Sequence, residues 1–385
     1  MKAYTESKKF TERSRNIGLR FLFASLGLIL PIFLFEIGAR ALAVNKLSDQ
    51  DRFAVVNEHQ LNPDDANLWC NPDQSLNADA VKIFAFGGSS VFGCCGTVSL
   101  QQAFPAELER KLASSGKYAV RSYALSGRDS FYHHRCVERL TLAGAQARYW
   151  VYYAGHNDYI NGRVGFPHIS IFLQKHPVVF RGINWTLKNM HLAGLLRNFS
   201  YPAFPSISSH KFAENKATIF EEYARNVEAT HSLIKAAGGK IILITVVSNL
   251  EHPPIFREAH GPDSDPRENA LALFEQGMAQ KRTKPLESLK ILKAARDWDR
   301  STWRAPSEVN QFLRALAAKN PDSIHLIDLE EKLDSVFPRE GIGCNFFGEG
   351  NYCDHLHPNL RLHREIAEHL RQAVIALERE SKAAI

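Results

Sequence analysis

A serine inside a glycine-rich turn is the first candidate for chemistry in this chain. Residues 81–86 are rich in β-branched and aromatic residues, with Lys82 as the one charged residue, as is typical of a strand buried on both faces, and the run ends at Gly87-Gly88-Ser89-Ser90. This pattern predicts a strand, a tight turn and a helix, with Ser89 at the carboxyl edge of a parallel sheet, where open α/β folds bind ligands. A turn that merely holds a small polar cap is the alternative, because Gly-Gly-Ser turns are common.

Three further polar segments follow predicted strands. They are Leu125-Ser126-Gly127-Arg128-Asp129-Ser130, Gly155-His156-Asn157-Asp158 and, before the last helix, Asp354-His355-Leu356-His357-Pro358-Asn359. Carboxyl ends of parallel strands meet at one edge of a sheet, so we expect these segments to converge on Ser89. Their residue types match an ester-cleaving site, which needs a hydroxyl nucleophile, a base, a carboxylate and donors for an oxyanion.

Each of these requirements has a candidate. Ser89 supplies the nucleophile, His357 is the candidate base, and Asp354, three residues earlier, can hold the second ring nitrogen of His357. The expected oxyanion donors are the backbone N–H groups of Ser89 and Gly127 and the side-chain amide of Asn157. Loss of one such donor typically costs about 3 to 4 kcal/mol of transition-state stabilisation, so we expect Asn157 to matter nearly as much as the base.

In order and placement, the four segments resemble the sequence blocks of the SGNH hydrolases, also called the GDSL esterase/lipase superfamily. Residues 87–93 stand where that family has Gly-Asp-Ser-x-x-x-Gly, Gly127 matches the glycine of the second block, Gly155-x-Asn157-Asp158 matches the third and Asp354-x-x-His357 the last. The resemblance covers residues 81–375 apart from two insertions. It implies a three-layer α/β/α fold of the flavodoxin-like type and a serine esterase, for which we expect no cofactor and no metal.

The chain also departs from the family pattern. Gly88 replaces the aspartate of the first block, which is not the nucleophile, and Ser122 is the nearest match to an asparagine common before the second-block glycine. Two further patterns resemble a membrane-anchored bacterial branch of the superfamily: Ser248-Asn249-Leu250 followed by Pro253-Pro254, and Trp303-Arg304-Ala305.

Several neighbours of the candidate residues have a second interpretation. Ser90 is the alternative nucleophile, but alignment of the blocks favours Ser89. His355 is expected at the surface or behind the site, and His156 either lines the pocket or is a hydrogen-bonded spacer. Arg304 is either an anion contact or a solvated side chain.

Metal binding has little support in the sequence. His133 and His134 are adjacent, and neighbouring residues on a helix point about 100° apart, so one ion cannot easily bind both. No Cys-x-x-Cys spacing occurs, which argues against zinc. Arg128 and Asp129 follow the second-block glycine and could form a helix-start pair with no catalytic duty.

The elements that must position these residues alternate between strand and helix. After the strand from Val81, strands are predicted at residues 118–125, 147–153, 240–247 and 324–328, with helices at 131–143, 218–237 and 360–380. This alternation indicates right-handed βαβ crossovers and a parallel sheet of about five strands with helices on both faces. The hydrolase domain is expected to span residues 81–380.

Two insertions interrupt the alternation. Residues 160–215 are rich in aromatic residues and prolines with a basic tint, and are too long for a simple connection, so we expect a cap beside the active edge. Residues 250–305 contain two predicted short helices, 268–280 and 286–297, which we interpret as a packing hairpin.

The N-terminus predicts a membrane anchor. Much of the net charge of +6 lies before residue 21, and the remainder is close to balanced, so there is no sign of a nucleic-acid-binding surface. Residues 21–43 are long and apolar enough to span a bilayer, behind a cytoplasmic basic leader at 1–20 and before a linker at 44–80. A cleaved signal peptide is the rival, because Ala41-Leu42-Ala43 has the small-x-small pattern of a cleavage site.

The six cysteines suit the oxidising compartment that this orientation implies. Cys344 and Cys353 bracket a short glycine-rich loop and are the first choice for a disulfide, whereas Cys70, Cys94, Cys95 and Cys136 could pair in several ways or stay partly free. Export by a single-pass anchor predicts a protein of the inner membrane whose catalytic domain is periplasmic or otherwise extracytoplasmic.

Together these patterns predict an extracytoplasmic serine esterase that acts on an acylated carbohydrate or lipid. Transfer of the acyl group to a sugar hydroxyl of an exported polysaccharide is the alternative, because an esterase and an O-acyltransferase share the first half-reaction. A non-catalytic binding or assembly protein on the same scaffold is the third possibility, and the loss of the aspartate at Gly88 keeps it open.

Overall fold

The computed structural model describes residue 70, residues 79–93, 99–162, 209–254, 269–299, 303–340 and 354–383, and single positions between 168 and 182. The chain divides into two compact units, one of residues 1–58 and 178–206 and the other of residues 59–177 and 207–385. All elements discussed below belong to the second unit. The predicted leader and anchor lie outside the described residues, and within the described part no helix combines the length and hydropathy of a membrane span.

The predicted five-stranded parallel sheet is confirmed. Its strands are β1 (Val81–Gly87), β2 (Tyr118–Ser122), β3 (Tyr149–Tyr153), β4 (Lys240–Ile244) and β5 (Ile324–Ile327). All neighbours pair in parallel in the order β2-β1-β3-β4-β5. β2 is predicted to continue to Leu125, and the chain does run on beside β1, since the N–H groups of Tyr123 and Leu125 donate to the carbonyls of Ala85 and Gly87.

The hydrophobic runs in the sequence correspond to the central strands. Every residue of β3 and the last five residues of β1 are buried, whereas β2, at the edge of the sheet, is partly exposed. Strands covered on both faces must be apolar throughout, which explains why β1 and β3 lack the alternation of a half-exposed strand.

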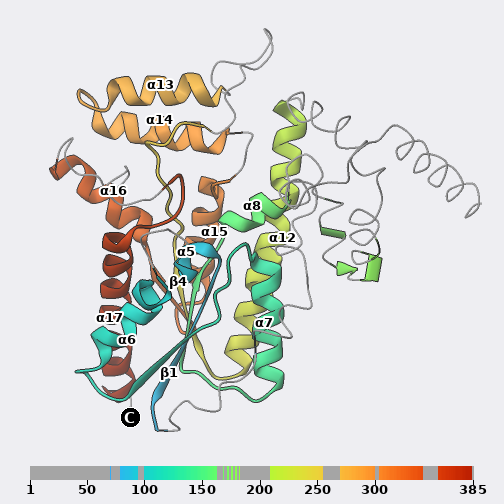
Figure 1. Ribbon diagram of the computed structural model, residues 1–385, viewed down its shortest axis with the longest axis vertical. Coiled ribbons are helices and arrows are strands. Elements are labelled where there is room, and N and C mark those ends of the chain that lie inside the picture. The colour runs from blue at the N-terminus through green and yellow to red at the C-terminus, as the bar shows by residue number, and fades with distance from the viewer. Residues whose placement is uncertain are drawn as a thin grey trace, which may run out of the picture. The chain divides into compact units, whose positions relative to one another are not determined.

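Helices cover both faces of the sheet. Figure 1 shows α6 (Phe104–Leu112) and α17 (Leu360–Ala383) on one side and α7 (Ser130–Leu142) and α12 (Ser209–Ala236) on the other, and the members of each pair contact each other. The remaining described helices are α5 (Ser89–Phe92), the 3₁₀ helix η1 (Leu100–Gln102), α8 (His156–Gly162), α13 (Ala270–Gln280), α14 (Pro285–Asp297), α15 (Ser307–Lys319) and α16 (Leu329–Glu340). The described domain is therefore the expected three-layer α/β/α arrangement.

The insertions differ in how far the structure describes them. α12 begins at Ser209, nine residues before the predicted helix start at 218, so the end of the insertion predicted at 160–215 is helix. The hairpin predicted at 268–280 and 286–297 is confirmed as α13 and α14, which pack closely together. Figure 1 places this hairpin on the side toward which the carboxyl ends of the strands point.

One disulfide lies within the described residues. Cys70 is bonded to Cys136 on α7, 66 residues further along the chain, which resolves one of the pairings left open by the sequence. The predicted Cys344–Cys353 bridge, together with Cys94 and Cys95, lies outside the described residues.

The strand order fixes where a site can form. In a sheet of order 2-1-3-4-5 the connections leave β1 and β3 in opposite directions, and the gap between their carboxyl ends is the usual ligand site. Gly87 at the end of β1 pairs with Tyr153 at the end of β3, so the segments that follow these strands start side by side. They contain Ser89 and Asn157.

Candidate active site

The nucleophile candidate sits at the first residue of a short helix. β1 ends at Gly87, Gly88 is the N-cap, and Ser89 begins α5, which closes with a left-handed Gly93. The first N–H groups of a helix have no acceptor within it, so the N–H of Ser89 is available to a ligand. The Ser89 side chain is nearly buried, with 8 % of the residue exposed.

The structure brings Ser89, His357 and Asp354 into one hydrogen-bonded chain. The Oγ of Ser89 lies 2.8 Å from Nε2 of His357, and Nδ1 of His357 lies 2.6 Å from Oδ2 of Asp354. A carboxylate can only accept, so Nδ1 carries the ring proton and Nε2 is left as the acceptor for the serine hydroxyl. This is the geometry that a general base requires before a serine attacks an ester.

Asp354 is held as a carboxylate. Its Oδ1 accepts the backbone N–H groups of Leu356 and His357, each at 2.8 Å. Burial opposes the charge, but the hydrogen bonds from the His357 side chain and from these two N–H groups outweigh it and hold the pKa of Asp354 below its ordinary value. An ionised Asp354 fixes the His357 tautomer and can stabilise an imidazolium.

A neighbouring loop holds the turn that carries Asp354. After β4, Asn249 donates its N–H to the carbonyl of His355 at 3.0 Å and its Nδ2 to the carbonyl of Asp354 at 3.2 Å. Arg304 fixes that loop in turn, because it donates to the carbonyls of Asn249 and His252 and pairs with Asp299 at 3.1 Å. Arg304 is buried, so the interpretation of it as a solvated side chain is wrong, and its described partners are Asp299 and the two loop carbonyls.

The oxyanion donors predicted from the second and third blocks lie in turns that touch each other. Nδ2 of Asn157, in the first turn of α8, donates to the carbonyl of Arg128 at 2.8 Å. Gly127 precedes Arg128 and has a φ of +74°, a left-handed conformation that favours glycine. An amide nitrogen carries two hydrogens, so Asn157 keeps a second N–H for a ligand.

Gly88 explains how Asn157 comes so close to the nucleophile turn. A Cβ on residue 88 would lie 2.0 Å from Nδ2 of Asn157 and 3.2 Å from the carbonyl oxygen of Arg128. The amide of Asn157 therefore occupies the space that any side chain at this position would need. A glycine at position 88 therefore leaves room for the amide of Asn157 beside the nucleophile turn.

The other histidines near the site have structural contacts. His156 is buried, its Nδ1 accepts the N–H of Ala305 at 2.9 Å, and its Nε2 donates to the carbonyl of Val247 at 3.2 Å, so it is a hydrogen-bonded spacer. Burial lowers the pKa of His156 to about 3. His355 stacks edge-on against Trp303, with 5.3 Å between ring centroids.

The remaining alternatives from the sequence are placed as follows. Ser90 is buried within α5, and the His357 imidazole contacts Ser89. Asp129 is the N-cap of α7 and accepts the N–H of Tyr132, as a helix-start residue does. The His133 ring is buried edge-on to Tyr152, and in the described part of the chain no cluster of His, Cys, Asp or Glu is arranged to hold a metal ion.

Comparisons with known proteins give similarity at the level of solved structures. No family model and no curated protein matches the chain. An acetyl xylan esterase, AlAXEase, is 14 % identical with a TM-score of 0.40, over 76 % of this chain and all of that one. A GDSL-like lipase from Bacteroides thetaiotaomicron is 12 % identical with a TM-score of 0.37, over 86 % of this chain and 100 % of that one. The esterase EstA from Pseudoalteromonas is also 12 % identical with a TM-score of 0.37, over 78 % of this chain and 99 % of that one. At these values, activity has to be argued from the site alone.

Proposed function

We propose that this protein is a serine esterase of the SGNH type that cleaves an O-acyl group from a carbohydrate. The observation that carries the proposal is the hydrogen-bonded chain from Ser89 through His357 to Asp354, in which Ser89 and His357 are 268 residues apart in the sequence. The buried Ser89 hydroxyl lies 2.8 Å from an imidazole that a carboxylate orients. Nucleophilic catalysis by a serine needs this arrangement.

The chemistry follows from the order of these contacts. Ser89 Oγ attacks the ester carbonyl while its proton passes to Nε2 of His357, and Asp354 stabilises the resulting imidazolium. The carbonyl oxygen becomes an oxyanion that the N–H of Ser89, the N–H of Gly127 and the second N–H of Asn157 would stabilise. When the C–O bond to the alcohol breaks, the alcohol takes the proton from Nε2 and the acyl group stays on Ser89. Water then attacks with His357 as base, releasing the acid.

A carbohydrate is favoured over a lipid by an exposed aromatic ring beside the site. Trp303 is 45 % exposed, an unusual state for so large a side chain, yet its neighbours Arg304 and Ala305 are fixed by the contacts described above. It packs against His355, which follows Asp354 in the chain and packs at 5.5 Å on His252. An exposed indole ring with an imidazole beside it can stack on the apolar face of a sugar while the imidazole binds a hydroxyl.

The location belongs to the same proposal. Residues 21–43 would anchor the protein in the inner membrane with the basic leader in the cytoplasm and the hydrolase domain outside. This location would bring exported or envelope polysaccharides to the site, and a sugar hydroxyl in place of water would then make the enzyme an O-acyltransferase. Mass spectrometry of the mature N-terminus tests the anchor, because a chain beginning at Val44 would have lost it.

Acetate release from an acetylated oligosaccharide by the full-length protein in detergent tests the activity. Wild-type protein and the Ser90→Ala control should release acetate, whereas Ser89→Ala and His357→Ala should lose at least about 1,000-fold in kcat, since removing a triad member removes the nucleophile or its base. Repeating the reaction with an unacetylated acceptor distinguishes transfer from hydrolysis. If wild-type protein neither releases nor transfers acetate, the scaffold interpretation replaces the esterase.

A further inference from the structure

The third block carries a buried carboxyl group that the reaction above does not use. Asp158 follows Asn157 on α8 and is 8 % exposed. Its Oδ1 accepts two hydrogen bonds from Ser130 at the start of α7, from the backbone N–H at 3.1 Å and from Oγ at 2.5 Å. Oγ of Ser130 in turn accepts from Nδ2 of Asn226 on α12 at 3.0 Å. One carboxyl group thus links three helices.

These contacts run parallel to the one that positions Asn157. The turn from Gly127 to Ser130 meets the turn at Asn157 and Asp158 through two links: Asn157 to the Arg128 carbonyl, and Ser130 to Asp158. Arg128 and Ser130 are two residues apart, and Asn157 and Asp158 are adjacent, so the two links lie close together. The Ser130–Asp158 link therefore helps to hold the Asn157 amide beside Gly88, the residue that precedes Ser89.

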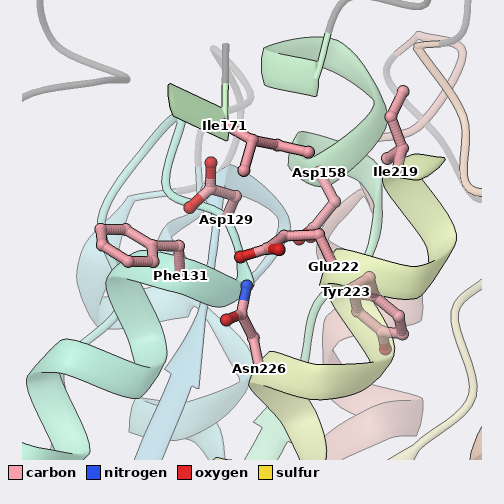
Figure 2. Close-up of a pocket in the computed structure, with 8 residues that line it drawn as sticks. All are labelled: Asp129, Phe131, Asp158, Ile171, Ile219, Glu222, Tyr223 and Asn226. Carbon is pink, nitrogen blue, oxygen red and sulfur yellow. The ribbon is translucent and has the colours of Figure 1, made fainter. Parts of the chain in front are cut away.

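Asp158 has one oxygen without a partner in the described part of the chain and also lines a small pocket. Oδ2 is buried and has no hydrogen-bond partner among the described residues. Figure 2 shows Asp129, Asp158 and Glu222, from three different elements, around a cavity of about 20 Å³ that Asn226 also lines. A cavity of this size has room for one water molecule.

The surroundings of Asp158 disfavour a negative charge. Two further acidic side chains lie nearby, Asp129 and Glu222. Lys175 and Arg225 both pair with Glu222, and the buried Arg128 guanidinium interacts electrostatically with Asp129. Three tyrosines from different elements interact electrostatically with Asp158, namely Tyr152 on β3, Tyr159 on α8 and Tyr223 on α12. Burial, and after it the Asp129 carboxylate, raises the pKa of Asp158 to about 8 despite the hydrogen bonds from Ser130.

We propose that Asp158 is a positioning residue that works as a neutral carboxylic acid, with Oδ1 accepting from Ser130 and an Oδ2 proton directed into the cavity, so that Asn157 stays aimed at the oxyanion. This role rests on the proposed esterase function. Ionisation of Asp158 would place a second negative charge beside Asp129 in a buried setting, push the two turns apart and misplace the donor. The proton is bound or released at Asp158 itself and takes no part in ester cleavage.

The pH dependence of kcat with p-nitrophenyl acetate tests the proposal, with the rate of Ser89→Ala subtracted at each pH. Wild-type kcat should fall above about pH 8. In Asp158→Asn the amide oxygen still accepts from Ser130, and the NH₂ group still donates into the cavity. The kcat of this variant at pH 7 should therefore stay within about threefold of wild type, and its fall above pH 8 should disappear. Asp158→Ala should lose about tenfold or more in kcat with KM within about twofold, because only the transition state meets Asn157.

Two outcomes of the kinetics would overturn the proposal. If Asp158→Asn is as impaired as Asp158→Ala, the ionised form is the one required. If Asp158→Asn keeps the same fall above pH 8, another group causes it.

An infrared difference spectrum between wild type and Asp158→Asn at pH 6.5 tests the proton without kinetics. A protonated carboxyl band present only in wild type is expected, and its absence would refute the neutral form even if the variants turn over poorly. A wild-type protein that shows this band but cleaves no ester would refute the proposed function and the positioning role, while leaving the proton assignment intact.

Discussion

Replacing Gly88 with alanine is expected to displace one oxyanion donor while leaving the fold intact. The added Cβ would lie 2.0 Å from Nδ2 of Asn157, and ordinary contact begins at 3.4 Å, so the two groups must separate by 3.4 − 2.0 = 1.4 Å. The φ of Gly88 is −85°, so alanine does not meet the left-handed constraint at this position. The short Asn157 side chain is the group that can move, and moving it breaks its 2.8 Å bond to the Arg128 carbonyl.

The expected magnitude follows from the loss of that donor. Removing one oxyanion donor costs about 2.7 to 4 kcal/mol, or 100- to 1,000-fold in kcat, with little change in KM because the ground state does not use it. Gly88→Asp, which restores the residue common in the superfamily, should be no better than Gly88→Ala. Gly182→Ala is the matched control, because a Cβ there meets nothing within 4 Å.

Steady-state kinetics with p-nitrophenyl acetate measure the effect, and a double mutant tests its cause. If Gly88→Ala acts by displacing Asn157, then Gly88→Ala combined with Asn157→Ala should be about as slow as Asn157→Ala alone. A Gly88→Ala enzyme within threefold of wild type, or a double mutant whose losses multiply, would refute the reasoning.

Three further predictions follow from the contacts around the site. Trp303→Ala should raise KM for an acetylated oligosaccharide about tenfold while leaving kcat on p-nitrophenyl acetate unchanged. Trp303→Phe should restore most of the binding. Equal effects on both substrates would show that the Trp303 ring does not bind the sugar. Asn249→Ala removes the side-chain bond to the Asp354 carbonyl and should lower kcat about tenfold, as measured against the conservative Asn249→Gln; an unchanged kcat would show that the turn holds itself. Burial keeps His156 neutral in the fold, whereas in the unfolded chain it protonates near its ordinary pKa. The unfolding free energy from urea titrations should therefore fall as the pH drops from about 6.5 toward 3. A His156→Gln protein with an equally steep fall would contradict this.

The sheet was predictable because its strands are buried on both faces. Residues 83–86 contain no polar side chain, and the glycine and polar residues that follow them mark the carboxyl edge. Boundaries were less predictable where packing decides them. α12 starts at Ser209, within a stretch whose aromatic residues and prolines indicate an irregular cap, because nothing local marks the start of a helix that is stabilised by contacts with α7 and α8.

The candidate site was predictable as a set of residue types and a shared edge of the sheet. Asp354 and His357 could be paired from their spacing, but the 2.8 Å contact of His357 with Ser89 depends on how α17 and β1 are placed across the domain. The support from Asn249 could have been suspected, since it is a polar residue just beyond the carboxyl end of β4.

Contacts formed by tertiary packing could not be derived from the sequence. The burial of Arg304 depends on a partner, Asp299, and on carbonyl groups of a loop about 50 residues away, neither of which has a distinct sequence signal. The role of Gly88 could not be derived from the sequence either. The sequence shows only a glycine where the resembling family has an aspartate, whereas the structure shows that the Asn157 amide occupies the space a side chain would need. Asp158 is part of a recognisable block, yet its unpartnered oxygen follows from the position of α12.

Labelling of the full-length protein with a fluorophosphonate, followed by peptide mass spectrometry, tests the central claim most directly. The probe reacts only with a hydroxyl that a base has activated, so the adduct should map to Ser89 and be lost in Ser89→Ala and His357→Ala but kept in Ser90→Ala. An adduct on Ser90, labelling that survives His357→Ala, or no labelling of folded wild-type protein would contradict a serine esterase built on Ser89, His357 and Asp354.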